Sequence, residues 1–421
     1  MFRVTLLLAT ISVALLVTGV PDAVLHGDIS HGRLMSSTQT ATSGSILQRP
    51  VVRVLTAPSE LVLNEPGTVT VQAEAPAVPG DVVVLDTAGT SNIGYNKVSQ
   101  AVLDENLRAT LQVTGREFVG AYRYWAKIPA SATYQEGTSA TFSVTIDSAP
   151  PPAGPTCGGD APARADGTTW TCTFDDEFDG PTLDRRYWAV QTTRKSGFTT
   201  GTSAMYACAA DTPDTVAVDQ GNLNLSLVEL PAVSRCRANK SSKYAFGQVM
   251  HFQTFSQTYG KYEVRAKIPD LDVPGSQQSF WLWPKKNTYG AWPASGEIDF
   301  AELYSSRPNL DRPYLHYLPG KTTAGSNDNI THANCPIRPG EYNTYGLEWK
   351  PGQLTVLLNG DVCFTDDYSS AAAAFQGKYS PFDKPFYLSL TQAMGTTGNV
   401  YDPAVVPEKV TTQIDYVRIW K

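Results

Sequence analysis

The last 265 residues of this chain consist of short segments in which apolar and polar residues alternate. GKYEVRAKIP, QQSFWLWP, LTVLLNGDVCF and TQIDYVRIWK have the period of two that strands with one buried face require. The one run with helical composition, SSAAAAF, is short. Because strands do not alternate with helices, a parallel βαβ sheet is excluded. We predict an all-β fold, with one large antiparallel β-sandwich or jelly roll over residues 157–421.

A proline-rich stretch precedes this region. SAPPPAGPT, residues 148–156, has four prolines in nine positions and cannot continue a sheet or a helix, so we predict a stiff linker. Upstream of it, residues 50–147 carry further short strand patterns about ten residues apart, with Gly, Pro and Asn between them. This spacing predicts a small immunoglobulin-like β-sandwich before the large one.

The N-terminus has the pattern of an export signal. Arg3 is followed by a 17-residue apolar run, Val4–Val20, which predicts a signal peptide over residues 1–25. A retained membrane anchor is the alternative. Residues 26–49 are rich in Ser, Thr and Gly and predict a disordered leader. No later stretch is long and apolar enough to span a bilayer, so we expect a secreted or cell-envelope protein without a membrane span after signal removal.

The cysteines agree with export. All six lie after residue 156, at positions 157, 172, 208, 236, 335 and 363. None has the CxxC spacing of a zinc site. Six cysteines allow fifteen pairings, and the sequence alone does not choose among them. Sequential pairing, 157–172, 208–236 and 335–363, would close loops of plausible size and restrict the unfolded chain.

The charge balance limits the partners. A net charge of −7 and the lack of any Lys/Arg run argue against nucleic acid and favour an uncharged or weakly charged substrate. We expect a monomer.

The segment GEIDFAEL concentrates three carboxylates in a chain in which only 17% of residues are charged. On a strand Glu297 and Asp299 point the same way, whereas Glu302 has the wrong parity. A β-bulge at Phe300–Ala301 would bring Glu302 to the same face. The two glutamate side chains could then approach to roughly 5–5.5 Å, the separation of a retaining glycosidase.

Two other readings of these carboxylates remain open. One is a solvated acidic strand, which fits poorly beside Trp281, Trp283 and Trp292. The other is a Ca²⁺ site, for which the Asn and Gly residues of a binding loop are missing.

WPASGEIDFAEL resembles the active-site strand of glycoside hydrolase family 16, in the bulged E-x-D-x-x-E form typical of laminarinases. Further segments resemble the family in the same order and cover nearly all of residues 157–421: FDDEFDGPTLDRRYW, GNLNLSL, YGKYEVRAKIP, FWLWP, YNTYGLEWKPGQLTVLLNG and IDYVRIW. The resemblance implies a concanavalin-like jelly roll whose concave sheet forms an open cleft, which suits endo-attack on a polymer.

The resemblance also implies roles for the carboxylates. Glu297 would be the nucleophile, Glu302 the general acid/base, and Asp299 would hold the nucleophile and tune the ionisation of the site. Three adjacent carboxyls cannot all ionise cheaply, so we expect at least one proton to be retained near neutral pH.

The same resemblance suggests residues that contact substrate. Trp281 and Trp292 would stack on sugar rings, and core positions are the alternative for both. For Trp283 a core position is expected. His316 would also reach the substrate, with a structural role as the alternative. Apart from the resemblance, Arg265 would face the cleft if Val264 and Ala266 face the core, with a structural salt bridge as the alternative.

A structural calcium ion occurs in some members of the family. Its ligands would map to the backbone carbonyls of Glu177 and Gly221 and to the carboxylate of Asp415, with a plain surface aspartate as the alternative. Catalysis itself would need no cofactor.

Together these features predict a secreted retaining endo-glycosidase that acts on β-linked glucan. The form of the motif favours β-1,3-glucan. Thr391 stands where many relatives have asparagine, so the sugar specificity is open. A transglycosylase that remodels an envelope polysaccharide and a non-catalytic carbohydrate-binding protein are the alternatives.

Overall fold

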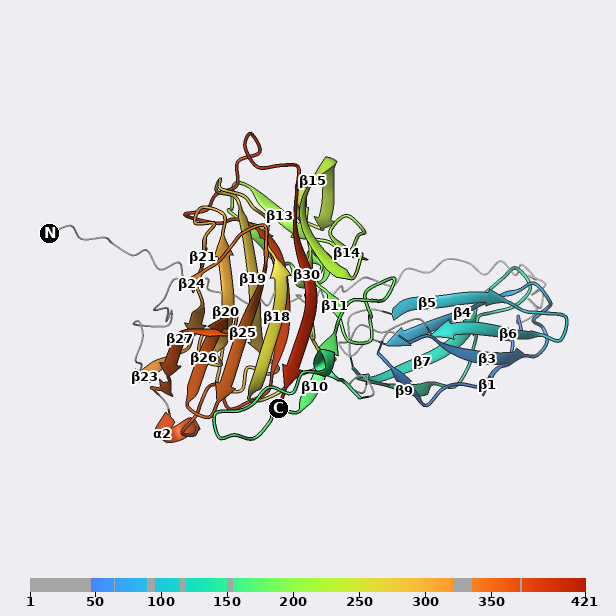
Figure 1. The fold of residues 1–421 in the computed structure, drawn as a ribbon. Helices are drawn as coiled ribbons and strands as arrows, with labels where there is room; N and C mark the ends of the chain where they lie inside the picture. The colour runs from blue at the N-terminus through green and yellow to red at the C-terminus, as the bar shows by residue number, and fades with distance from the viewer. Residues whose placement is uncertain are drawn as a thin grey trace, which may run out of the picture. The chain divides into compact units, whose positions relative to one another are not determined.

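The computed structural model describes residues 47–63, 65–88, 95–113, 119–149, 154–321, 335–371 and 373–421 (Figure 1). Within these ranges the only helices are α1 (Thr193–Ser196), α2 (Ala373–Gln376) and the 3-10 turn η1 (Cys157–Gly159). None of them is long or apolar enough to cross a membrane. The predicted signal peptide, leader residues 26–46 and linker residues 150–153 lie outside the described residues.

Residues 47–149 form two sheets around a core of their own. The first has the order β1 (Val52–Thr56), β3 (Gly67–Ala73), β6 (Arg108–Val113). The second has the order β2 (Glu60–Val62), β9 (Phe142–Asp147), β7 (Gly120–Ile128), β4 (Val82–Ala88), β5 (Tyr95–Val102), with β8 (Gly137–Thr138) beside β7. The more specific assignment, an immunoglobulin-like module over residues 50–147, stays a prediction.

The remainder of the described chain is dominated by two large sheets. The larger has 11 strands, in the order β12 (Thr199–Gly201), β13 (Tyr206–Ala209), β16 (Lys240–Phe246), β15 (Asn222–Arg237), β30 (Lys409–Trp420), β18 (Gly260–Lys267), β25 (Tyr342–Lys350), β26 (Gln353–Leu358), β27 (Asp361–Asp367). In addition, β10 (Cys172–Asp176) pairs with β30 and β14 (Val216–Asp219) with β15.

The second large sheet has eight strands and carries the carboxylate segment. Its order is β11 (Ala189–Val190), β17 (Gln248–Met250), β29 (Phe386–Met394), β19 (Ser276–Pro284), β20 (Glu297–Tyr304), β21 (Leu310–Asp311), β24 (Cys335–Pro336), and β22 (Tyr314–His316) pairs with β20. A separate two-stranded sheet joins β23 (Pro319–Lys321) to β28 (Ser369–Ser370).

The two large sheets pack face to face (Figure 1). The ring of Phe280 on β19 lies 5.2 Å from that of Tyr345 on β25, and Trp349 on β25 lies 5.4 Å from Phe386 on β29. Inward residues of both sheets are buried while their neighbours face outward, as the alternation in the sequence requires. The predicted all-β jelly-roll sandwich is therefore confirmed.

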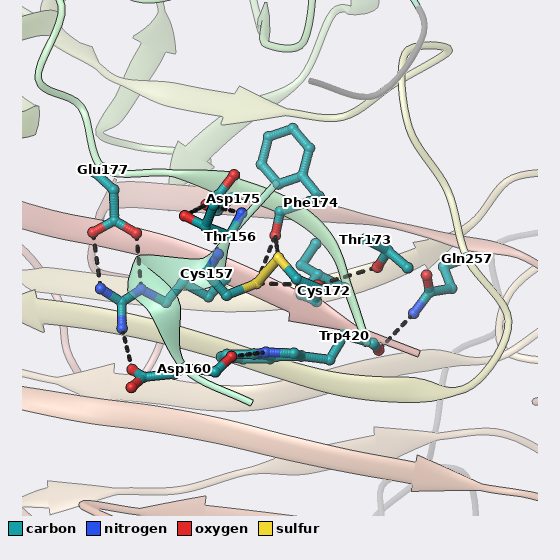
Figure 2. The surroundings of a disulfide bond; sticks show 12 residues. Thr156, Cys157, Asp160, Cys172, Thr173, Phe174, Asp175, Glu177, Gln257 and Trp420 are labelled. Atoms are coloured by element: carbon teal, nitrogen blue, oxygen red, sulfur yellow. Dashed lines mark hydrogen bonds and ion pairs between the residues drawn. A yellow bond between two sulfur atoms is a disulfide. The ribbon is translucent and has the colours of Figure 1, made fainter. Parts of the chain in front are cut away.

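The three disulfides join the cysteines in sequential order, Cys157–Cys172, Cys208–Cys236 and Cys335–Cys363, as the loop lengths suggested. Figure 2 shows the first of them. Next to it, the Asp175 carboxylate accepts the backbone N–H of Cys157 at 2.7 Å, and the indole of Trp420 donates to the carbonyl of Asp160. This disulfide therefore holds the start of the large sandwich against β10, which pairs with the last strand β30.

Candidate active site

Strand β20 changes parity between Phe300 and Ala301. In its pairing with β19, Ala301 lies opposite Phe280 and Asp299 lies opposite Trp281, so Phe300 has no partner. Phe300 and Ala301 are adjacent in the chain, yet both are fully buried in the core between the sheets. These are the features of a β-bulge, at the position that the sequence predicted.

The bulge brings the three carboxylates to one face of the sheet. Glu297, Asp299 and Glu302 all line the same cleft, which has a volume of about 530 Å³. The cleft lies over β17, β19, β20 and β29 and reaches the segment of residues 198–201. It brings together the three predicted catalytic residues with Trp281 and His316 of the predicted substrate-binding set.

Glu302 is held by three hydrogen bonds that the sequence did not reveal. Its Oε1 accepts the side-chain amide of Gln277 at 2.7 Å, and its Oε2 accepts the hydroxyl of Tyr304. Its backbone N–H donates to the buried carboxylate of Asp311 at 2.9 Å. Strand parity could have found two of these partners, since Gln277 shares a face with Trp281 and Tyr304 lies two residues after Glu302.

Glu297 and Asp299 have partners from neighbouring segments. The indole Nε1 of Trp292 donates to Glu297 Oε2 at 2.6 Å, and the Trp292 ring lies 5.4 Å from that of His316. His316 on β22 lies directly opposite Glu297 in the register, with its Nε2 3.2 Å from Asp299 Oδ2. Trp292 is 49% exposed, so its ring remains accessible beside the carboxylates.

Burial dominates the ionisation of this cluster. Desolvation and, after it, the negative charge of Asp299 raise the pKa of Glu297 to about 8, although His316 and the Trp292 hydrogen bond oppose the rise. Desolvation and the charge of Glu302 hold the pKa of Asp299 well above its usual range. Burial also raises the pKa of Glu302. The cluster therefore retains protons near neutral pH, as expected for three crowded carboxyls.

Two tryptophans of β19 line the cleft together. The indole of Trp281 donates to Thr391 Oγ1 at 3.0 Å, and the rings of Trp281 and Trp283 lie 5.7 Å apart, nearly perpendicular. The expectation of a core position for Trp283 is wrong. Positions 281 and 283 share one face of the strand, and Phe280 and Leu282 take the buried face.

Arg265 does not reach the cleft, and this part of the substrate-binding prediction is corrected. It lies on β18 in the other sheet, between the fully buried Val264 and Ala266, and so points away from the interior. Its guanidinium binds the carboxylate of Asp415 and lies 4.4 Å from the ring centre of Tyr342. Arg265 therefore has the alternative role, a structural salt bridge, because the cleft lies on the opposite sheet.

Of the residues predicted to bind calcium, Asp415 has its carboxylate already paired. The Asp415 carboxylate binds Arg265. The Glu177 carboxylate, labelled in Figure 2, accepts hydrogen bonds from Nε and Nη2 of Arg418 at 2.8 and 3.0 Å, and these bonds do not involve the backbone carbonyl that is the predicted ligand. An ion near Gly221 would need the charge of Asp415, which a guanidinium now neutralises. In this arrangement Arg265 competes with a calcium ion for Asp415, which supplies the one carboxylate of the predicted ligand set. A calcium site there stays a prediction that requires Arg265 to move.

Two face-packed and mainly antiparallel sheets, with a carboxylate-lined cleft on one of them, define a jelly-roll β-sandwich protein. This chain belongs to glycosyl hydrolases family 16, whose model matches residues 203–417.

The chain is similar to two curated enzymes. It is 28% identical over 264 residues to "Glucan endo-1,3-beta-glucosidase A1" of Niallia circulans, and the matched region covers 59% of this chain and 37% of the relative. It is 33% identical over 175 residues to "Glucan endo-1,3-beta-glucosidase" of Cryptopygus antarcticus, which covers 38% of this chain and 62% of the relative. The matched part thus spans less than two thirds of either relative.

A solved structure has the same fold. SCLam, described as a non-specific endo-beta-1,3(4)-glucanase from family GH16, superposes with a TM-score of 0.50 at 24% identity, over 62% of this chain and 94% of SCLam.

Proposed function

We propose that this chain is a secreted retaining endo-glycosidase that hydrolyses β-linked glucan, with β-1,3-glucan as its main substrate. The observation that carries the proposal is the bulge in β20, which lets two glutamates five positions apart face the same cleft. Two carboxylates that flank a scissile bond from one strand suit double displacement. The names of the two curated relatives support β-1,3-glucan as the substrate.

The surroundings of each glutamate suit its role. Glu297 would attack the anomeric carbon and form a covalent glycosyl-enzyme, and the indole N–H of Trp292 stabilises its ionised form. Glu302 would protonate the leaving oxygen and then take a proton from the water that hydrolyses the intermediate. Gln277 and Tyr304 hold the two carboxyl oxygens of Glu302 in position while Glu302 first gives up a proton and then takes one up.

The cleft and the cysteines support the rest of the proposal. Trp281 and Trp283 offer two indoles to sugar rings, as a polysaccharide partner requires. All six cysteines are in disulfides, which suits an exported protein. The reaction needs no cofactor, and the enzyme acts as a monomer.

A transglycosylase would use the same residues with a sugar as the acceptor in place of water. A non-catalytic binding protein on this fold has less support, because both glutamates are present and hydrogen-bonded in the cleft. Analysis of the products formed from a panel of β-glucans and galactans separates hydrolysis from transfer and identifies the linkage that is cut.

The decisive experiment is stereochemical. Proton NMR of the reaction with laminarin should detect the β-anomer of the new reducing end first, with the α-anomer appearing only by mutarotation. An α-anomer formed first would require a water between the carboxylate and the sugar, and would contradict the single-strand catalytic pair.

A further inference from the structure

Two segments of this acidic chain contain only positive charges. The whole sequence has 33 Lys and Arg against 40 Asp and Glu, whereas residues 189–210 and 230–246 together contain no acidic residue. Their cationic side chains are Arg194, Lys195, Arg235, Arg237, Lys240 and Lys243. These two segments are therefore strongly positive, although the net charge of the whole chain is negative.

The fold brings these two segments together at Gly197. Residues 230–246 form the end of the β15–β16 hairpin, and the ammonium of Lys240 donates to the carbonyl of Gly197 at 2.8 Å. The guanidinium of Arg237 lies against the Cα of Gly197. Arg194 is on α1, three residues before this glycine. The disulfide Cys208–Cys236 links the hairpin to β13 and so restrains the part of the hairpin that carries Arg235 and Arg237.

This basic region borders the candidate catalytic cleft. Phe198 and Thr199, which follow Gly197 directly, line the cleft that contains Glu297. Lys195 lines a neighbouring hollow of about 310 Å³, and that hollow shares Gln191, Met250 and Tyr387 with the cleft. Strands β19 and β29 separate β20 from β17 in the sheet, so β17, whose Met250 lines the hollow with Lys195, lies about 14 Å from β20 at about 4.8 Å per strand. A polysaccharide that extends across the sheet would reach it within a few sugars.

Most of these cations have no acidic partner. Lys243 is paired with Glu229. By contrast, Arg194, Arg235, Arg237 and Lys240, here called the cationic rim, form no ion pair with any residue in the described part of the chain. Arg194, Arg235 and Arg237 are exposed. Arg237 and Lys240 lie at Gly197, directly before the cleft residues Phe198 and Thr199. Arg235 donates to two carbonyls of its own hairpin turn. Like charges this close repel, and an anion between them would relieve that repulsion.

We propose that the cationic rim binds anionic substituents, sulfate or carboxylate, on the polysaccharide chain that lies in the cleft. This inference rests on the proposed function and narrows its substrate to β-glucan that carries such groups. Guanidinium groups bind planar carboxylates and sulfate oxygens through paired N–H donors, and exposed contacts of this kind weaken as salt is added. The uncharged sugars at the scissile bond still stack on the tryptophans, and the carboxylates still cleave the bond.

The test compares laminarin with carboxymethylated and with sulfated laminarin of low substitution. For the full chain at low ionic strength, kcat/KM should be roughly fivefold higher on a charged glucan than on laminarin, and added salt should remove the difference. The double variant Arg237→Gln/Lys240→Gln should lose the preference while its kcat/KM on laminarin stays unchanged. Arg338→Gln, which removes one exposed positive charge on the loop before β25, is the control and should keep the preference.

Several outcomes would overturn the inference. It is wrong if the wild type does not favour either charged glucan at low salt, or if the double variant keeps the preference. It is also wrong if the double variant loses only binding to vesicles that contain phosphatidylglycerol, because the rim would then be a membrane-docking surface. A preference for only one of the two charged glucans identifies the substituent and supports the inference.

Failure of the proposed function gives a different result. If no glucan is cut, titration calorimetry of Glu297→Gln with carboxymethylated laminarin still measures the rim. Binding that is tighter than for laminarin, and that Arg237→Gln/Lys240→Gln abolishes, supports the inference, and equal binding of the two glucans contradicts it.

Discussion

The Nε2 atom of His316 lies 3.2 Å from Oδ2 of Asp299. This contact joins two neighbours that act on Glu297 in opposite directions, since His316 lowers the pKa of Glu297 and the charge of Asp299 raises it. The ionisation of the proposed nucleophile is therefore set by residues on β20 and β22 as well as by its own burial. Changing these neighbours one at a time should move the pH profile in directions that can be predicted.

The variant Asp299→Asn should extend activity to lower pH. The reaction needs Glu297 ionised, and removing the negative charge of Asp299 lowers the pKa of Glu297 from about 8, so the acidic limb of kcat/KM moves to lower pH. The rate at the optimum should fall roughly 10- to 100-fold, because Asp299 no longer pairs with His316. A profile of kcat/KM on laminarin between pH 4 and 9 measures both effects. An acidic limb that stays in place would contradict the charge coupling.

The variant Trp292→Phe should have the opposite effect on the same limb. It keeps an aromatic ring but removes the indole N–H that donates to Glu297, so the pKa of Glu297 rises and the acidic limb moves to higher pH. The same profile provides the measurement, with Trp283→Phe as the control because Trp283 lines the cleft without a hydrogen bond to Glu297. If both variants move the limb equally, the hydrogen bond is not the cause.

The variant Glu297→Gln should abolish hydrolysis and make the protein more stable at high pH. Activity should fall below about 0.1% of wild type, as expected for loss of a nucleophile. Glu297 has a folded pKa of about 8 against 4.5 when unfolded, so between these values the folded state binds more protons. The unfolding free energy of the wild type therefore falls as pH rises through this window, and the amide removes that loss.

Thermal unfolding checks the second half of this prediction. The Tm of Glu297→Gln should exceed that of the wild type by roughly 2–5 °C at pH 8 and by less at pH 5. Glu341→Gln, at an exposed glutamate paired with Arg338, should have no such pH-dependent difference. Retention of a few per cent of wild-type turnover would instead show that the nucleophile is another residue.

The sequence predicts the features that follow from alternation along a single strand. It does not predict the features that depend on which of the two sheets a strand joins. The parity conflict at Glu302 was enough to predict the bulge, because strand alternation leaves few other ways to place three carboxylates together. Arg265 alternates correctly with Val264 and Ala266, but alternation does not say that the outer face of β18 belongs to the sheet without the cleft. The pairing of Asp311 with the backbone of Glu302 likewise depends on tertiary contact.

Calcium should not change the thermal stability of the wild type. Asp415 is bound by Arg265, so neither millimolar calcium nor a chelator should change Tm by more than about 1 °C. In Arg265→Gln the carboxylate is freed, and calcium should then raise Tm if the carbonyls of Glu177 and Gly221 converge on the same point. A calcium-dependent rise of several degrees in the wild type would mean that the ion displaces the guanidinium, and the predicted site would be supported.

His251 is a buried titratable group outside the cleft, and it should make the protein sensitive to acid. Its ring is fully buried against Phe174 and Trp188, at 4.5 and 4.0 Å between ring centres, and neither ring nitrogen has a hydrogen-bond partner in the described structure. Burial lowers its pKa from 6.5 to about 3. Between these values the unfolded state binds more protons, so stability is present above pH 6.5 and is lost as pH falls towards 3.

The variant His251→Phe keeps an aromatic ring and removes both unpaired nitrogens, so its Tm should exceed that of the wild type, by more at pH 5 than at pH 8. Tyr262→Phe is the matched control. It also removes a fully buried polar atom without a partner in the described structure, but one that does not titrate in this range, so its gain should be the same at both pH values. A gain for His251→Phe that does not grow at pH 5 would mean that His251 can bind a proton without leaving the folded core.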